Sequence, residues 1–133
     1  MKRWGDLASV EKYLLVLAGG AAGSLARYLA GTAIMNRFSG RFPLGTVIVN
    51  VTGCFLIGAI MTALTERAPG NPNLRLLLVV GFLGGYTTFS SFEWETFSVT
   101  RGGSPWLGLM NIVVSVVMGY LAVWLGALSV GRR

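Results

Sequence analysis

Four long apolar stretches constrain the fold of this chain more than any other feature of its sequence. They run over residues 13–35, 44–64, 74–99 and 106–130, with approximate boundaries. A transmembrane helix needs roughly 20 mostly apolar residues, so each stretch is long enough to cross a bilayer. The links between them are short and rich in Pro, Gly, Asn and Ser, which is typical of turns between helices. The sequence therefore predicts a single all-α membrane domain over residues 1–133 with four transmembrane helices.

The charge content agrees with a membrane location and excludes several kinds of function. Charged residues make up 12% of the 133 residues and hydrophobic residues 53%, whereas a soluble domain carries about 25% charged residues. We expect the net charge of +6 to anchor helix ends at lipid headgroups. Nucleic-acid binding would need a basic face on a folded soluble domain. The chain has no histidine and one cysteine, Cys54, which excludes zinc sites with His ligands and Ser–His–Asp or Cys–His catalysis, so we do not expect an enzyme.

The third apolar stretch is interrupted near its middle. From Gly81 to Phe92 it reads GFLGGYTTFSSF, with adjacent glycines followed by two threonines and two serines. In lipid, irregular backbone persists only where it lies against protein or a polar cavity. The run therefore predicts a broken third helix and a site for an ion or a polar substrate.

Arg27 lies inside the first apolar stretch. A lone arginine near the centre of a bilayer costs about 2.5 kcal/mol or more, so its side chain should face protein or water. Its five donors suit backbone carbonyls, which a broken third helix would supply. The alternative is an arginine that extends its charged end to the membrane interface. Nearby, Gly19 and Gly23 have the spacing of a close helix–helix contact.

Two further spans carry polar residues four apart, which places each pair on one helical face. These pairs are Thr46 with Asn50 on the second span and Asn111 with Ser115 on the fourth. One interpretation is hydrogen bonding between helices, with an energy of about 0.6 to 2 kcal/mol. The other is a donor pointed at an anion, because the amide of Asn50 offers two N–H groups.

The second half of the third span carries two faces of interest. Thr88, Ser91 and Glu95 share one face at helical spacing, and so do Phe89, Phe92 and Glu95. Aromatic residues at this spacing commonly pack in a core. Alternatively, the positive edges of the two rings attract an anion in a dry site.

Two carboxylates, Glu93 and Glu95, lie near one end of the third span. They fit a position at the headgroups, paired with Arg101 or solvated. In a proton-coupled transporter, one of them would instead carry a proton.

Three motifs in this order resemble the Fluc (CrcB-type) fluoride channel family. They run from Gly19 to Tyr28, from Gly45 to Phe55 and from Gly81 to Phe92. The similarity runs from about residue 15 to about residue 97 and extends more loosely to the fourth span. Three motifs with the expected spacing on three spans are a specific signal, whereas any one alone is not.

The resemblance implies an antiparallel, dual-topology homodimer in the cell inner (plasma) membrane, with two pores that passively export cytoplasmic fluoride. With four spans, both termini lie on one side, which carries seven cations against three on the other. This bias favours termini in the cytoplasm. Without the terminal cations Lys2, Arg3, Arg132 and Arg133 the balance is three against three, so dual topology remains the expectation.

The resemblance also implies roles for single residues. Asn50 would line the pore and donate to fluoride, Phe89 and Phe92 would present their ring edges to it, and Thr46 would lie toward a vestibule. A polar track beside the rings would consist of Thr88, Ser91, Glu95 and Ser115. Glu93 stands where a small polar residue is expected, so its role is open.

A structural sodium ion is the last implication of the resemblance. Carbonyls of Gly84 and Thr87 from both subunits would surround Na⁺ on the dimer axis, and Arg27 would support the break. Hard cations prefer such oxygen ligands.

Two alternatives remain at this stage. One is a small dual-topology, proton-coupled exporter of drugs or cations, which needs an essential carboxylate deep in a span; Glu93 and Glu95 are the candidates. The other is a non-transporting membrane subunit, which gives no account of the interrupted third span.

Overall fold

The computed structural model describes residues 3–67 and 71–131, and these residues form helices joined by short links, without strands. Four segments are long and apolar enough to cross a membrane, which confirms the predicted all-α architecture with four membrane-length helices. In chain order the elements are α1 (Arg3–Arg37), α2 (Leu44–Glu66), α3 (Pro72–Leu74), the π-helix η1 (Arg75–Leu83), α4 (Gly84–Tyr86), α5 (Phe89–Arg101) and α6 (Pro105–Val130).

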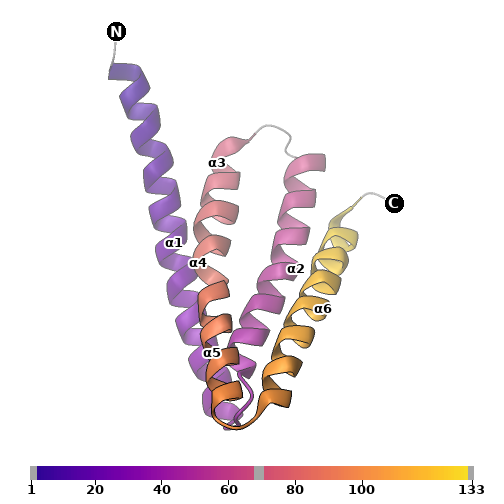
Figure 1. Ribbon diagram of the computed structural model, residues 1–133. Coiled ribbons are helices and arrows are strands. Elements are labelled where there is room, and N and C mark those ends of the chain that lie inside the picture. The colour runs from indigo at the N-terminus through magenta and orange to yellow at the C-terminus, as the bar shows by residue number, and fades with distance from the viewer. Residues whose placement is uncertain (1–2, 68–70, 132–133) are drawn as a thin grey trace.

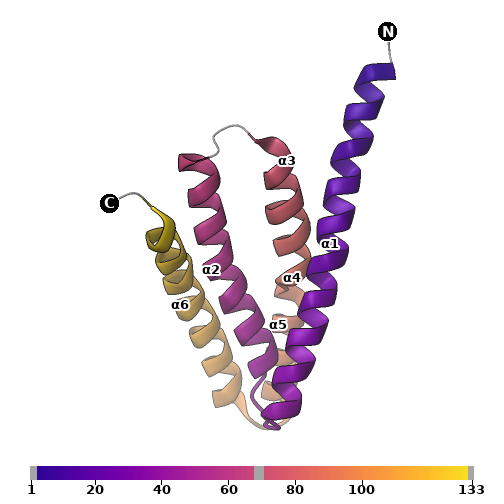
Figure 2. The ribbon, with the colours of Figure 1, turned by 180° about the vertical axis from the view of Figure 1, so that it is seen from behind.

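The helices stand side by side and spread apart toward one end (Figure 1). They converge at the end that holds the α1–α2 and α5–α6 links, and both termini lie at the opposite end. The view from behind shows the same arrangement and shows that α1 extends well beyond the other helices (Figure 2). The most extensive contacts are between α2 and α6 and between α1 and η1.

Glycines set how closely these helices approach. A Cβ atom added at Gly23 of α1 would overlap the Phe82 carbonyl of η1, and one at Gly19 would lie 2.8 Å from the Phe82 nitrogen. On the other side of the bundle, Gly126 of α6 lies against the Phe55 carbonyl of α2 in the same way. The predicted close contact through Gly19 and Gly23 is therefore confirmed, because only a residue without a side chain fits there.

The third span is built from several helical pieces. It begins at Pro72, at the first helical turn, where Asn71 accepts a hydrogen bond from the Leu74 N–H at 3.1 Å. The π-helix η1 follows, with wider i→i+5 turns. Helix α4 ends at Tyr86. Thr87 and Thr88 then have extended backbone, with ψ of 156° and 121°, before α5 begins.

The outer surface of the bundle is strongly apolar. Many large hydrophobic side chains are exposed along the helices, and few residues of the described chain are buried. A patch of this extent would be unfavourable in water and suits contact with lipid or another subunit. The four spans and this surface indicate a multi-pass membrane protein.

Candidate functional site

The interrupted backbone at Thr88 is held by the side chain of Asn50, which lies on α2. Asn50 Nδ2 donates to the Thr88 carbonyl at 2.9 Å, and the Thr88 N–H donates to Asn50 Oδ1 at 2.8 Å. The amide thus satisfies both backbone groups of a residue that has left the helix. One N–H of the Asn50 amide is not used by this pair.

The same pairing changes the surroundings of the Gly84 and Thr87 carbonyls. In a continuous α-helix the Thr88 N–H would donate to Gly84, but here it donates to Asn50. Likewise, the Ser91 N–H donates to Thr88 Oγ1 at 3.3 Å, which caps α5, instead of to Thr87. Both carbonyls are released from their usual helical donors. Gly84 is exposed and Thr87 half-buried.

Arg27 reaches the interrupted span from α1. It is half-buried, and its Nε donates to the Gly85 carbonyl at 2.9 Å. A Cβ added at Gly85 would lie 2.5 Å from the Gly20 carbonyl, so α1 and α4 are in backbone contact here. Arg27 therefore faces protein inside the first span. It donates to a carbonyl of the third span, which is the span predicted to supply acceptors for it.

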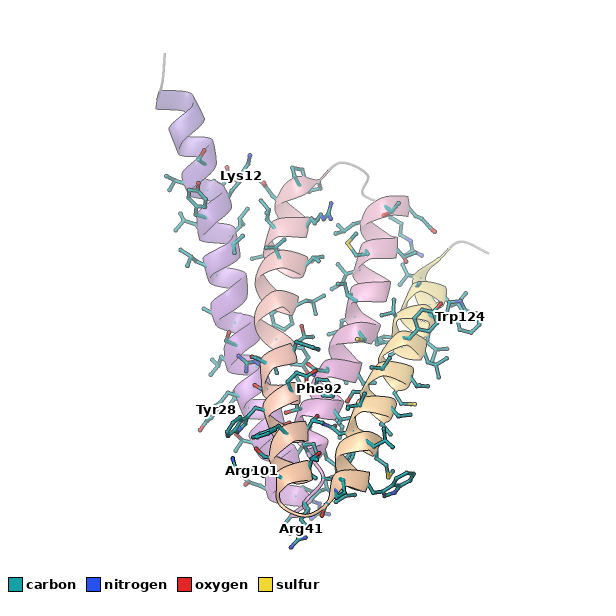
Figure 3. The ribbon with its side chains drawn as sticks, viewed as in Figure 1. Lys12, Tyr28, Arg41, Phe92, Arg101 and Trp124 are labelled. Carbon is teal, nitrogen blue, oxygen red and sulfur yellow. The ribbon has the colours of Figure 1, made fainter. Side chains whose placement is uncertain are left out.

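The two phenylalanines of α5 differ sharply in burial. Their ring centroids are 5.8 Å apart with planes tilted by 44°. Phe92 is 6% exposed and lies inside the bundle (Figure 3), whereas Phe89 is 73% exposed. An exposed aromatic ring beside the interrupted backbone needs lipid or a second subunit to cover it.

A cavity of about 600 Å³ lies between α1, α2 and α5. Thr46 and Glu95 form part of its wall, and Thr46 Oγ1 donates to Glu95 Oε1 at 2.8 Å. Glu95 Oε2 is buried and accepts no hydrogen bond from the described residues. The cavity reaches the converging end of the bundle, because Arg41 is another of its lining residues and lies at that end in Figure 3. The other predicted residues that line it are Arg27, Thr88 and Ser91.

A second cavity of about 360 Å³ lies between α2 and the third span. Its lining includes Asn50, Phe89 and the carbonyl-bearing residues Gly84 and Thr87. Thr88 lines both cavities. The Asn50–Thr88 pair therefore stands at the wall between them. Of the predicted site residues, Phe92 and Ser115 line neither of these two cavities.

The fourth span contributes a buried polar group. Asn111 is fully buried, and its Nδ2 donates to Thr96 Oγ1 on α5 at 2.7 Å. Thr96 in turn donates to the Phe92 carbonyl at 2.8 Å. Ser115 is half-buried and donates to Asn111 Oδ1 over 3.5 Å. The Asn111–Thr96 bond thus links α5 and α6. Hydrogen bonding between helices was one of the two interpretations given for Asn111 and Ser115.

The sequence did not reveal a second contact between α2 and the interruption. Thr52 Oγ1 and the Tyr86 hydroxyl are 2.9 Å apart, and Tyr86 stacks on Phe82 with planes 9° apart. Thr52 lies two positions beyond Asn50 on α2, which is not on the same helical face, so spacing alone gave no signal for it.

Comparison with known proteins identifies the family. The family described as CrcB-like protein, Camphor Resistance (CrcB), matches residues 14–127. The chain belongs to this CrcB-like family. The resemblance to Fluc (CrcB-type) proteins is therefore confirmed, and the match covers most of the fourth span.

Curated relatives are similar over nearly their full length. A protein of Solibacter usitatus is 63% identical over 121 residues, which cover 91% of this chain and 99% of the relative. A protein of Acidobacterium capsulatum is 48% identical, with 92% and 97% covered, and one of Coxiella burnetii is 43% identical, with 90% and 97% covered. All three carry the name fluoride-specific ion channel FluC.

Proposed function

We propose that this chain forms a fluoride-selective channel that exports cytoplasmic fluoride across the cell inner membrane by passive permeation. The observation that carries this proposal is the 63% identity, over 91% of the chain, to a relative named fluoride-specific ion channel. Membership of a channel family also supports a function other than catalysis. Two cavities that lie on either side of the Asn50–Thr88 pair support the proposal of a path for an ion at this place.

Fluoride is small and strongly hydrated, so a selective path must replace its water with close donors. The unused N–H of Asn50 is one such donor. The Ser91 hydroxyl is a second, because Thr88 Oγ1 donates to it at 3.0 Å and leaves its own proton available. The positive ring edges of Phe89 and Phe92 would complete the surroundings of the ion. Thr46, Glu95 and Ser115 would form the polar route on either side.

The chemistry of the interruption fits the sodium ion that the family resemblance implies. The Gly84 and Thr87 carbonyls have lost their helical donors to Asn50 and to the Thr88 side chain. Uncharged backbone oxygens are suitable ligands for a hard cation. One chain offers two such carbonyls, so a second copy would raise the number to four. When bound, Na⁺ would hold the two interruptions together, while Arg27 supports the Gly85 carbonyl from α1.

An antiparallel homodimer with two pores accounts for surfaces that a single chain leaves open. Phe89 is 73% exposed, Gly84 is exposed, and both line the second cavity. Covering them with a second copy would bury the ring that the pore requires. Without the terminal cations Lys2, Arg3, Arg132 and Arg133, the balance of three cations against three permits both orientations in the membrane.

Fluoride efflux from proteoliposomes tests the proposal directly. Wild-type protein should release fluoride and not chloride, at the same rate with and without a proton gradient. Phe89→Ile should abolish the release, because an aliphatic side chain has no positive ring edge. The matched control is Phe97→Ile, which changes another exposed phenylalanine of α5 that lines neither cavity. Equal efflux from Phe89→Ile and Phe97→Ile would contradict the pore assignment.

One observation favours a second candidate function, that of a proton-coupled exporter. Glu95 is a carboxylate in the wall of the larger cavity, with one oxygen that accepts no described hydrogen bond. A proton-coupled exporter of cations or drugs would use such a group as its proton carrier. Proton-driven substrate accumulation that is lost in Glu95→Gln would favour the exporter.

A further inference from the structure

The short helix α4 holds the carbonyl that is proposed to bind sodium, and α1 contacts it through Gly85, whose carbonyl accepts the bond from Arg27. It consists of Gly84, Gly85 and Tyr86, so Tyr86 carries its only side chain. Glycine has the greatest backbone freedom of all residues. On the side of α2, the contacts of Tyr86 are therefore the ones that can fix the orientation of the Gly84 carbonyl.

A stacked ring and a hydrogen bond help to hold the side chain of Tyr86. Its ring is stacked almost parallel on Phe82 of η1, with centroids 5.8 Å apart. Its hydroxyl lies 2.9 Å from Thr52 Oγ1 on α2. The first contact is within the third span, whereas the second connects the span to a neighbouring helix.

The direction of the hydrogen bond follows from the other contacts of Thr52. Thr52 Oγ1 lies 2.8 Å from the Ile48 carbonyl and 3.0 Å from the Val49 carbonyl, and it donates its one proton to this pair. The Tyr86 hydroxyl must then be the donor to Thr52. Because a carbonyl-bonded threonine cannot turn freely, its oxygen is a defined anchor point for Tyr86.

The anchor acts on the same short segment as the Asn50–Thr88 pair. Asn50 holds the chain two residues after Tyr86. Between them, a Cβ added at Gly53 would overlap Thr87 Cγ2, so α2 and Thr87 are in direct contact. Helix α2 therefore holds both sides of the interruption, with Thr52 on the α4 side and Asn50 on the α5 side.

We infer that Tyr86 is a positioning residue for the cation site: its hydrogen bond to Thr52 sets the orientation of the Gly84 carbonyl. This inference rests on the proposed sodium site. Loss of one neutral hydrogen bond should weaken sodium binding about threefold to tenfold. The sodium-saturated channel should remain as active as the wild type, because Tyr86 does not line either cavity.

The test compares Tyr86→Phe, Thr52→Val, the double variant and Thr52→Ser in the purified full-length protein. Tyr120→Phe is the matched control, since Tyr120 is an exposed tyrosine on α6. Melting temperature in detergent and fluoride efflux from proteoliposomes are each measured as a function of Na⁺ concentration, with K⁺ as the replacement ion. Binding of Na⁺ to the folded protein alone raises the melting temperature.

The expected result is a threefold to tenfold higher half-maximal Na⁺ concentration in Tyr86→Phe and in Thr52→Val, at unchanged maximal efflux. The double variant should shift no further, because both changes remove the same bond. Thr52→Ser and Tyr120→Phe should match the wild type. If Tyr86→Phe does not fold, Thr52→Val decides the outcome alone.

Three results would overturn the inference, and they separate it from the proposed function. A wild-type Na⁺ response in both Tyr86→Phe and Thr52→Val would reject the positioning role and leave the sodium site intact. If both variants lower the melting temperature by the same amount at all Na⁺ concentrations, the bond stabilises the fold without acting on the cation site. A wild-type protein that releases fluoride with no response to Na⁺ would reject the sodium site and the positioning role together, while the channel function would stand.

Discussion

The side chain of Asn50 pairs with the backbone of Thr88 through two hydrogen bonds, of 2.9 Å from Nδ2 and 2.8 Å to Oδ1. One amide from α2 thereby supplies an acceptor to the Thr88 N–H, which has left the helical pattern, and a donor to the Thr88 carbonyl. An unsatisfied buried backbone group is costly, so this pairing allows the third span to leave the helix within a membrane. It also leaves one amide N–H, which is the donor proposed for fluoride.

Replacing Asn50 with alanine should therefore impair both stability and transport. The Thr88 N–H loses its acceptor, at a cost of about 1–3 kcal/mol if it remains unsatisfied, and the Thr88 carbonyl loses a donor. Fluoride efflux should fall to background, and the melting temperature should decrease. Asn73→Ala is the matched control, because Asn73 makes an exposed bond of 2.9 Å to Glu11, far from the cavities. Normal efflux from Asn50→Ala would show that the amide is no part of the permeation path.

Arg27 should matter through the Gly85 carbonyl that its Nε contacts at 2.9 Å. Arg27→Met keeps much of the side-chain volume but removes a charged donor, which costs about 1.5–3 kcal/mol. Arg27→Lys should recover only part of this loss, because lysine has no Nε–H fork. Thermal unfolding in detergent measures the loss, and Arg37→Met, at the exposed end of α1, is the control. Equal melting temperatures for the two methionine variants would contradict a supporting role for Arg27.

Hydropathy and spacing were sufficient to predict the four membrane-length helices, because each apolar stretch is long and its links are short. They also predicted that Arg27 faces protein or water, of which the structure shows protein, and that Gly19 with Gly23 lies at a helix contact. The family resemblance then assigned roles that hydropathy alone could not, such as those of Asn50 and Gly84.

The partners of these residues could not be predicted from the sequence. Asn50 meets Thr88, and Thr52 meets Tyr86, because the register between α2 and the third span is set by three-dimensional contacts such as Gly53 against Thr87. The π-helix η1 was also missed: its i→i+5 bonding changes which residues face α1 without changing the apolar composition.

The glycine contact between α1 and the third span gives a prediction about assembly of the bundle. Gly23→Ala should destabilise the protein by about 1–3 kcal/mol, because the new methyl group would overlap the Phe82 carbonyl and force the helices apart. Gly31→Ala adds the same methyl group on the same helix, where nothing lies within 4 Å, and should gain a few tenths to about 1 kcal/mol from helix propensity. Unfolding titrations of both variants measure the difference. Equal stability would contradict the close approach of α1 to η1.

Glu95 separates the proposed channel from a proton-coupled exporter. Glu95→Gln keeps an oxygen that can accept the 2.8 Å bond from Thr46, but it removes the negative charge from the wall of the larger cavity. A channel for anions should then release fluoride at least as fast as the wild type, because a repulsive charge beside the path is gone. The rate should be unaffected by a proton ionophore. The control is Glu93→Gln, which makes the same change two residues away at an exposed position that lines neither cavity. Two results together would reject passive permeation in favour of proton coupling through Glu95. Efflux would be abolished in Glu95→Gln but not in Glu93→Gln, and the wild-type rate would depend on the proton gradient.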